Sequence, residues 1–442
     1  MKIQLSDSFT YKKLILFTIP SIAMMVFSSI YGIIDGYFIS NFIGDTEFAA
    51  VNFIIPFTMI LGSFGFMFGS GGSALIAKTL GMGEEKKANS LFSLFVYIIL
   101  LTSGILAVLG IIFIEPIVKM LGAEGKMIDS AVLYGRILLI SLPFCMAQIA
   151  FQSFFPLAEK PQLGFIITVI AGITNIVLDA LFIVVFKWGV VGAAVATAIS
   201  QVLGGLLPIL YFLLPNNSKL RIGKTSIDFR SIGQASTNGM SEFLSNIAMS
   251  LVSMIFNSQL MKYEGEKGVA TYGVLMYVGF IFFAVFIGYS MGAAPVIGYH
   301  YGAENKKELK GVLKRSLVIV GILSVVMVIS SLLLSYPLSK LYVGYNEELM
   351  NLTVRAFKFF SFVFLFSGIS IFGSSFFTAL NNGFISALIS FLRTIVFQVI
   401  AIFTLPLIMG TDGIWLSIVF GDFAAALLAV ICLLSNKKRY GY

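Results

Sequence analysis

The sequence is poor in charge and in cysteine. Of its 442 residues only 11% are charged, whereas 58% are hydrophobic and the mean hydropathy is +0.98. A water-soluble globule cannot bury so much apolar surface, so the surroundings of this chain are largely lipid. The only two cysteines, Cys145 and Cys432, each lie inside an apolar run, and a disulfide framework is therefore not indicated.

Motifs for catalysis and cofactor binding are also missing. No GxxxxGK[ST] nucleotide-binding loop occurs in the chain. One histidine, His300, and two distant cysteines do not make a zinc site. The long loops lack paired acids, a nucleophile with a base, or metal-ligand spacing. We therefore expect no cofactor and no enzyme activity, and an integral-membrane enzyme is the weakest of the alternatives.

The charge that is present is mainly positive, with 29 Lys and Arg against 21 Asp and Glu. The basic residues form short clusters between apolar runs instead of one patch, which is typical of the positive-inside rule and not of nucleic-acid binding. If both termini are cytoplasmic, 19 of the 29 fall on that side. The first apolar stretch follows Lys12 and Lys13 without a small-residue cleavage site, so we interpret it as a spanning helix and not as a signal peptide.

The apolar runs predict an all-α integral membrane protein. A spanning helix needs about 20 mainly apolar residues. Cutting the chain at charged or turn-rich clusters leaves twelve runs, near 12–39, 48–77, 91–114, 137–157, 161–185, 189–214, 237–261, 269–298, 316–339, 356–380, 384–409 and 413–435.

The two halves of the chain resemble each other at an offset of 221 residues. At this offset Gly44-Asp45 falls on Gly265-Glu266, and Gly192 falls on Gly413. A duplicated unit of six helices keeps its orientation in the membrane, so the two pseudo-symmetric lobes are expected around an axis along the membrane normal. The predicted domains are an N-terminal lobe at 1–214, a cytoplasmic linker at 215–236 and a C-terminal lobe at 237–442.

Small, aromatic and sulfur-containing residues are abundant. The densest glycine series indicates close helix packing, with a moving joint as the alternative, and comprises Gly62, Gly65, Gly69, Gly71 and Gly72. The 44 Phe and 18 Met face lipid or packed interior for the most part. A minority would suit a cavity for varied apolar ligands.

Four acids lie well inside predicted spans: Asp35, Asp179, Glu242 and Asp422. An Asp at the centre of a membrane helix costs about 3 kcal/mol on insertion scales. Such residues usually face the bundle interior and mark an ion or substrate path. The alternative is that they are buried acids satisfied by neighbouring hydroxyls, with no role in transport.

Asp179 has the most informative surroundings. Asn175 lies four residues earlier and therefore on the same helix face. Thr197 on the next helix and Asp35 on the first can supply further oxygens, which gives an all-oxygen cluster that suits sodium. The same cluster can instead bind a proton, because burial favours the neutral carboxyl group. The coupling ion, sodium or proton, stays open.

The motif "NIVLDALFI" followed by "GVVGAAVATAISQ" resembles the fifth and sixth helices of the multidrug and toxic compound extrusion (MATE) family. Further resemblances are "YGIIDGYFIS", "GGSALIAKTLGMGEEKKA" and "PVIGYHYGAENKKEL", so both halves are covered. The glycine-rich segment and the "SEF" of the seventh helix are similar to the bacterial DinF-like and MepA-like branches. The resemblance implies two V-shaped lobes around a central cavity.

The resemblance also implies site residues. The N-terminal lobe would hold the cation site at Asp35, Asn175, Asp179 and Thr197, with Gln152 nearby. Pro20 matches a proline at which the first helix bends in some members, and a proline does remove one helix hydrogen bond.

The C-terminal lobe matches the family less completely. Glu242 resembles an acid of the seventh helix that binds cations in the NorM-like branch. Its partner acid in the tenth helix is absent, because that region reads "SGISIFGSSFF". Glu242 is therefore expected to contact cationic substrates, and Asp422 has no role that the family implies.

Together these features predict a secondary active transporter in the bacterial inner membrane that exports small organic compounds. Inward flow of sodium or protons would drive export by alternating access, and the chain would act as a monomer in the lipid bilayer with no nucleic-acid partner. The nearest alternative is a flippase for lipid-linked saccharides. A structural or sensory membrane protein is a third possibility, for which four intramembrane acids would be a costly accident.

Overall fold

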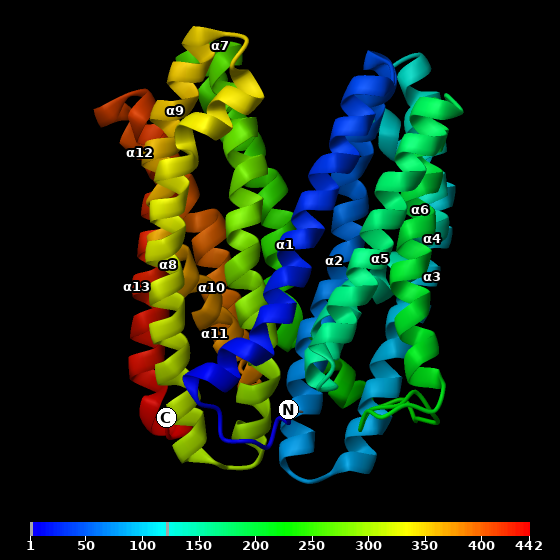
Figure 1. Ribbon diagram of the computed structural model, residues 1–442, viewed down its shortest axis with the longest axis vertical. Coiled ribbons are helices and arrows are strands. Elements are labelled where there is room, and N and C mark those ends of the chain that lie inside the picture. The colour runs from blue at the N-terminus through cyan, green and yellow to red at the C-terminus, as the bar shows by residue number, and fades with distance from the viewer. Residues whose placement is uncertain (1–2, 121–122) are drawn as a thin grey trace.

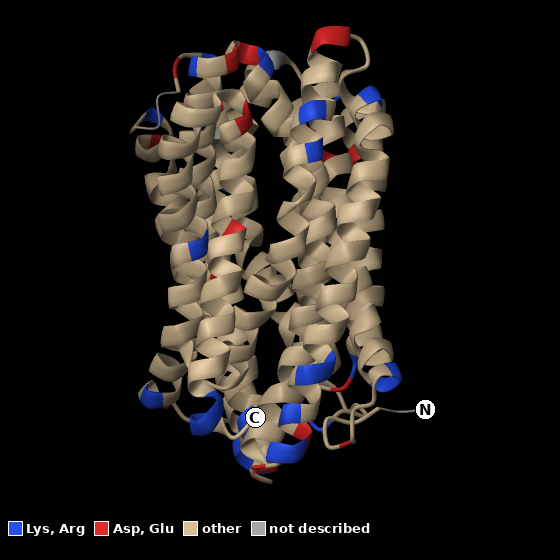
Figure 2. Cartoon of the chain, turned by 90° about the vertical axis from the view of Figure 1, so that its left-hand side faces the viewer, with Lys and Arg blue, Asp and Glu red and all other residues tan. Residues whose placement is uncertain are grey.

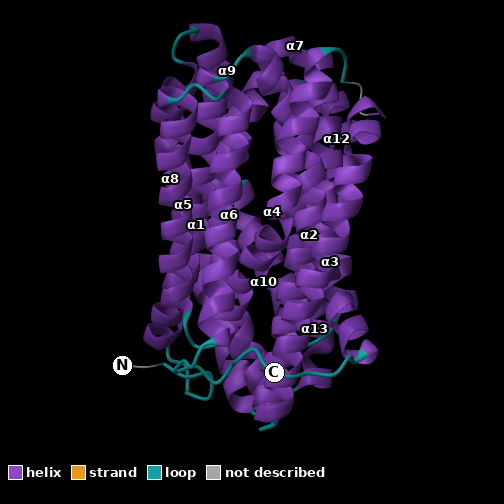
Figure 3. Ribbon diagram, turned by 90° about the vertical axis from the view of Figure 1, so that its right-hand side faces the viewer, coloured by secondary structure: helices purple, strands orange, loops and turns teal. Residues whose placement is uncertain are grey.

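The computed structural model describes residues 3–120 and 123–442, and every regular element in these residues is a helix (Figure 1, Figure 3). The N-terminal half contains α1 (Tyr11–Phe42), α2 (Asp45–Gly81), α3 (Glu85–Met120), α4 (Lys126–Leu157), α5 (Pro161–Asp179), the π-helical segment η1 (Ala180–Val185) and α6 (Gly189–Leu213). The C-terminal half contains α7 (Phe229–Gly302), α8 (Lys306–Val343), α9 (Glu347–Ser361), α10 (Val363–Ala379), α11 (Gly383–Phe391), the π-helical segment η2 (Leu392–Phe397), α12 (Gln398–Met409) and α13 (Thr411–Tyr440).

The twelve predicted spans are confirmed. Among the described residues, ten helices are long and apolar enough to cross a membrane, and the pair α9 and α10, bent by 45°, forms one more span. The 74-residue helix α7 supplies two spans, because its backbone breaks at Gly265. The predicted runs 237–261 and 269–298 lie on the two sides of this break, which we call the first and second arms of α7.

A glycine makes the break in α7 possible. Gly265 has φ 64° and ψ −151°, a conformation that residues with a side chain rarely adopt. The two arms then run back along each other, since the ring of Phe256 on the first arm stacks on Tyr272 of the second with centroids 5.4 Å apart. Ser253 and the hydroxyl of Tyr272 are also within hydrogen-bond distance, at 3.3 Å.

The seventh helix begins earlier than the sequence suggested. Asp228 is its N-cap, and its carboxylate accepts hydrogen bonds from Arg230 N at 3.0 Å and from Ser231 N at 3.2 Å. Bonds from the Ser231 hydroxyl and backbone hold the pKa of this exposed carboxyl group below its usual range. The stretch 229–236, predicted as part of the linker, is therefore helical.

The rest of the linker packs against the end of α6 and the start of α3. Asn89 on α3 donates to the carbonyl of Lys219 at 2.8 Å and accepts from Arg221 N at 2.7 Å. Leu220 and Ile222 are buried. The linker is thus held against the N-terminal lobe, because side chains of that lobe form the hydrogen bonds that its backbone groups need.

The helices form two lobes, with α1 to α6 in one and α7 to α13 in the other (Figure 1). Both termini lie at the same end of the molecule, and Lys and Arg gather there (Figure 1, Figure 2). The ribbons of the two lobes diverge toward the opposite end (Figure 1). The observed arrangement is the all-α, two-lobed bundle that the sequence predicts.

The lobes are in contact at the end that carries the termini. A Cβ added to Gly71 of α2 would lie 2.0 Å from the carbonyl oxygen of Ala235 on α7, and one added to Gly239 would lie 1.9 Å from that of Met67. Backbones can approach this closely only because the glycine on one side of each contact has no Cβ. The glycine series in α2 therefore serves packing, as the leading interpretation had it.

The N-terminal segment joins the two lobes at this end. The amide of Leu5 donates to Glu159, between α4 and α5, at 2.9 Å. The amide of Phe9 donates to Glu308 at the start of α8 at 2.8 Å, and Arg315 pairs with the same carboxylate at 2.9 Å. Leu5 and Phe9 are buried, so this short segment packs against residues of both lobes.

Candidate functional site

Three helices bring the four predicted cation-site residues together in the N-terminal lobe. Thr197 on α6 donates from its hydroxyl to Oδ1 of Asp35 on α1 at 3.5 Å. The carboxyl group of Asp35 also neighbours the side chains of Asp179 and Asn175 on α5. We call these four residues the N-lobe cluster. Their convergence was predicted, whereas their role in binding an ion stays a proposal.

The N-lobe cluster contains polar atoms that the protein does not satisfy. Asp179 is 0% exposed and Asn175 1% exposed. Within the described residues, neither carboxylate oxygen of Asp179 has a hydrogen-bond partner, and neither has the amide nitrogen of Asn175. Buried polar groups are normally paired, since an unpaired one costs about 1–3 kcal/mol. The two carboxylate oxygens of Asp179 are thus free to bind a proton or a hard cation, whereas the amide nitrogen of Asn175 can only donate.

The local helix geometry sets Asp179 apart. It is the last residue of α5, directly before the π-helical segment Ala180–Val185. A π-helical segment widens one turn of the helix and is frequent at functional sites. There the backbone amide of Phe186 donates a hydrogen bond to the carbonyl of Leu181, five residues earlier, at 2.9 Å. Asp179 therefore lies at a point where the backbone of the spanning helix changes its register.

Sequence analysis missed two tyrosines beside this cluster. Tyr134 on α4 is 2% exposed and is a neighbour of the carboxyl groups of Asp35 and Asp179. Tyr31 lies near Asp35 in the same way. The spacing of Tyr31 four residues before Asp35 was a signal that could have been used. Tyr134 had no such signal, because it precedes the predicted run 137–157.

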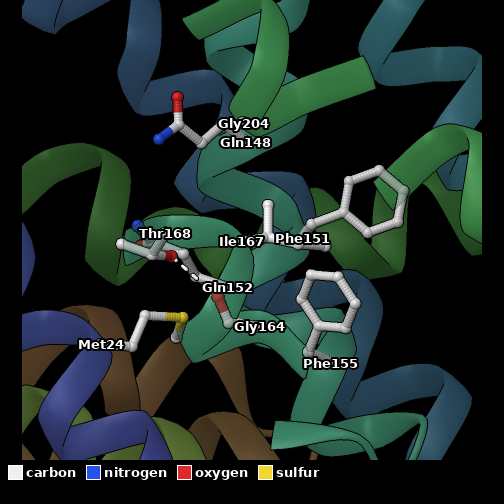
Figure 4. Close-up of a pocket in the computed structure, with 9 residues that line it drawn as sticks. All are labelled: Met24, Gln148, Phe151, Gln152, Phe155, Gly164, Ile167, Thr168 and Gly204. Carbon is white, nitrogen blue, oxygen red and sulfur yellow. Dashed lines mark hydrogen bonds between the residues drawn. The ribbon is translucent and has the colours of Figure 1, made fainter. Parts of the chain in front are cut away.

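Gln152 lies outside the N-lobe cluster. It lines a separate small cavity with Met24 of α1, Thr168 of α5 and Gly204 of α6 (Figure 4). Thr168 precedes Asp179 by eleven residues, so the two levels are about 16 Å apart along the helix axis. The Oε1 atom of Gln152 is buried without a hydrogen-bond partner among the described residues. Gln152 thus lies at another level of the lobe than Asp179, and its role as a contact for the cation or the substrate stays a prediction.

The C-terminal lobe contains a buried ion pair that the sequence did not reveal. Nε of Arg393, in η2, lies 2.7 Å from Oδ1 of Asp422 on α13, whose side chain is 1% exposed. Ser370 on α10 donates to the same oxygen at 3.3 Å, and the guanidinium lies 6.0 Å from the ring centre of Phe283. Asp422, which had no assigned role, is thus the partner of Arg393.

Glu242 belongs to the same region of the C-terminal lobe. It lies on the first arm of α7, is half-buried, and has Arg393 as a charged neighbour. We call Glu242, Arg393, Asp422 and Ser370 the C-lobe cluster. The tenth helix contributes the hydroxyl group of Ser370 to this cluster and no acid. The second acid of the lobe is Asp422, which comes from α13.

Pro20 lies within α1, which runs unbroken from Tyr11 to Phe42. Its ring leaves the carbonyl of Leu16 without the usual helix donor. The neighbouring Thr18 and Ser21 are buried, and both approach Gly292 of α7, since a Cβ added there would lie 3.1 and 3.2 Å from their atoms. The bend predicted at Pro20 stays a prediction, at a position beside the contact between the lobes.

A polytopic bundle of two similar lobes with acids buried in the membrane region has the architecture of a transporter. The MatE family profile matches this chain twice, at residues 20–181 and at 243–404. The chain therefore belongs to the MatE family. The double match, one to each half, also confirms the internal duplication, and the two starts are separated by nearly the offset that the sequence suggested.

Named relatives cover almost the whole chain. It is 26% identical over 435 residues to the multidrug export protein MepA of Staphylococcus haemolyticus, across 98% of this chain and 95% of that protein. It is 25% identical over 433 residues to MepA of Staphylococcus aureus, across 97% and 94%.

Solved structures share the fold. A crystal structure of a MATE protein in complex with MaL6 superposes with a TM-score of 0.92 at 22% identity, across 98% of this chain and 97% of that one. The outward-facing conformation of a multidrug resistance MATE family transporter of the MOP superfamily gives 0.91 at 22% identity, again across 98% and 97%. The twelve-helix architecture is thereby shown for this chain.

Proposed function

We propose that this protein is a multidrug efflux transporter of the bacterial inner membrane that exchanges organic, often cationic, compounds for sodium ions or protons. The observation that carries the proposal is the N-lobe cluster, where Asp179 is fully buried with both carboxylate oxygens unpartnered in the described structure. A carboxylate that binds and releases an ion in the membrane links transport to the ion gradient. The relatives named multidrug export proteins support the substrate class.

The energy source is the ion gradient. One elementary charge that crosses 100 mV releases about 2.3 kcal/mol, which suffices for useful accumulation without ATP. The cluster offers carboxylate, amide and hydroxyl groups, which accept sodium by coordination or a proton at a carboxylate. Separately imposed sodium and pH gradients distinguish the two ions. Both clusters are formed within one chain, which supports function as a monomer.

Alternating access requires the contact between the lobes to open and close. In the present state the backbones of α2 and α7 touch at Gly71 and Gly239, at the end that carries the termini. The N-terminal segment binds Glu159 and Glu308 at the same end. We propose that these contacts separate when the central cavity opens to the cytoplasm, and that they form when it opens to the other side.

The proposed function is tested by efflux from proteoliposomes that contain the purified protein and a lipophilic cationic dye. A sodium gradient and a pH gradient are imposed separately, with the membrane potential clamped. We expect one of the two gradients to accelerate dye movement about fivefold or more, since the coupling ion supplies the driving force. Equal rates with and without both gradients, or movement of lipid-linked saccharide but not of dye, contradict the proposal.

We further propose that both termini are cytoplasmic, because the basic residues gather at their end of the molecule (Figure 2). Single cysteines at Ser218 in the linker and at Gly44 between α1 and α2 test this in intact cells. A membrane-impermeant thiol reagent should label position 44 only. Asn217, which is exposed, is a second linker position in case the partly buried Ser218 reacts slowly. Labelling of the linker but not of position 44 reverses the topology.

A further inference from the structure

The two lobes place polar residues on corresponding helices, but with different charges. Counting spans, the N-lobe cluster comes from the first, fifth and sixth, and the C-lobe cluster comes chiefly from the seventh, eleventh and twelfth, which occupy the same places in the repeat. The charged members are Asp35 and Asp179 in the first lobe and Glu242, Arg393 and Asp422 in the second. Among the described residues, Arg393 gives the C-lobe cluster a permanent cation, and the N-lobe cluster contains none.

The N-lobe cluster has no basic partner. The titratable neighbours of its two acids are Tyr31, Tyr134 and each other, and within the described residues neither acid forms an ion pair. Two carboxylates at close range repel each other when both are ionised. A mobile cation or a proton is therefore needed to stabilise this arrangement.

The C-lobe cluster carries its own cation. The guanidinium of Arg393 is held by Asp422 at 2.7 Å and lies over the face of Phe283. A guanidinium stays protonated in proteins, so this charge cannot leave with a change of pH or ion concentration. With Asp422 neutralised by the pair, the cluster presents one net negative charge, which is that of Glu242.

We infer that Arg393 is a built-in counter-ion that occupies, in the C-terminal lobe, the role that the coupling ion has in the N-terminal lobe. The C-lobe cluster consequently takes up no exchangeable ion, and Arg393 sets the charge with which Glu242 meets a cationic substrate. Arg393 is thus a specificity-determining residue. The inference rests on the proposed function for the ion at Asp179, and its test separates the two.

The test measures the thermal unfolding midpoint of purified protein in detergent, in sodium chloride against choline chloride and between pH 5.5 and pH 8.5. Asp179→Asn removes the N-lobe site, so its midpoint should be insensitive to both variables. Adding Arg393→Gln to Asp179→Asn leaves Glu242 and Asp422 as two acids without a cation. This double variant should regain sodium or pH dependence, with a shift of a few degrees. Adding Arg393→Lys instead keeps the charge and should regain nothing.

The outcomes distinguish the inference from the proposed function. A double variant Asp179→Asn/Arg393→Gln that folds and stays insensitive to sodium and pH overturns the role of Arg393, even if wild-type protein is ion-dependent. If the wild-type midpoint is insensitive and Arg393→Gln alone gains dependence, the ion site at Asp179 fails and the inference stands.

A charge-neutral variant covers the case in which loss of Arg393 alone prevents folding. Arg393→Gln/Asp422→Asn removes both partners of the ion pair, which leaves no uncompensated buried charge. Because Arg393 is the cationic neighbour of Glu242, its loss should strengthen binding of a lipophilic cationic dye about threefold or more. Unchanged or weaker dye binding by this variant contradicts the inference.

Discussion

The N-lobe and C-lobe clusters occupy corresponding helices, yet they satisfy their buried acids in opposite ways. In the part of the chain that the structure describes, the two carboxylate oxygens of Asp179 have no hydrogen-bond partner, whereas Asp422 is bound by Arg393 at 2.7 Å and by Ser370 at 3.3 Å. On the proposed function, the coupling ion supplies the partner that Asp179 lacks, whereas Asp422 already has one within the protein. A duplicated scaffold can thus keep its helix arrangement while its two copies surround their buried acids with different partners.

The sharpest way to break this comparison is Asp179→Asn. An amide keeps the shape of the side chain but does not ionise and binds sodium weakly, so gradient-driven efflux should fall by about tenfold or more while the protein stays folded and inserted. Asp35→Asn should act in the same direction with a smaller loss. Efflux from dye-loaded vesicles measures both.

The matched control is Asp129→Asn. Asp129 is an exposed acid in the first turn of α4, in the same lobe but at the end of the helix. Its substitution should leave efflux and ion dependence unchanged. Wild-type efflux by Asp179→Asn, or an equal loss in Asp129→Asn, removes the N-lobe cluster from the coupling mechanism.

A second prediction concerns the contact that joins the lobes. Gly71→Ala places a methyl group 2.0 Å from the carbonyl oxygen of Ala235, and neither backbone can yield without separating the lobes. Overpacking of this kind costs about 1–3 kcal/mol, which should disfavour the state in which α2 and α7 are in contact and lower efflux severalfold. Efflux and the thermal unfolding midpoint are measured together.

Gly104→Ala is the control for this substitution, because a Cβ at Gly104 on α3 meets no atom of the described residues within 4 Å. It should leave efflux unchanged and raise stability by up to about 1 kcal/mol through helix propensity. Wild-type efflux and stability in Gly71→Ala would show that the close approach of α2 and α7 is not needed for transport.

Glu242→Gln addresses the substrate side of the comparison. A lone carboxylate in an apolar surrounding attracts a lipophilic cation, while aromatic faces hold its body. Export of cationic dyes should fall about threefold to tenfold, and export of neutral or anionic compounds should change little. The ion dependence of the remaining transport should stay as in the wild type.

The control is Glu266→Gln, an exposed acid beside the Gly265 break of α7. It should affect no substrate class. Equal losses for all substrates in Glu242→Gln, together with altered sodium or pH dependence, would assign Glu242 to ion coupling and remove the difference between the lobes.

The smallest effect is expected from Pro20→Ala. The proline lies in the unbroken helix α1. The repeat has no proline at the matching place in α7, where Ser241 and Glu242 stand. Alanine restores a donor for the carbonyl of Leu16, so α1 should become stiffer and efflux should fall by no more than about twofold. A loss as large as that of Asp179→Asn would make bending at Pro20 a necessary step.

The sequence was sufficient to predict the spans, the duplication and the N-lobe cluster. Apolar runs are set by the thickness of the bilayer, and they identify helices without knowledge of packing. Asn175 and Asp179 are four residues apart on one helix, so their convergence is local. The addition of Thr197 and Asp35 needed both the search for further oxygens and the resemblance to the family.

The C-lobe cluster was not predicted, because its contacts are between helices. Arg393 and Asp422 are 29 residues apart, and no helix spacing brings them together. The level of Gln152 on α4 relative to α5 could not be predicted for the same reason, since it depends on how the helices pack. The early start of α7 did have a local signal, the N-cap residue Asp228.

The central claim is that only the N-terminal lobe takes up the coupling ion, and the affinity for substrate tests it most directly. Binding of a cationic dye is titrated on purified protein at several sodium concentrations and pH values. Ion and substrate linked by exchange must influence each other's affinity by the same factor. Dye affinity should depend on the ion in the wild type and in Asp422→Asn, and should lose that dependence in Asp179→Asn. Dependence that persists in Asp179→Asn and disappears in Asp422→Asn would place the ion in the other lobe.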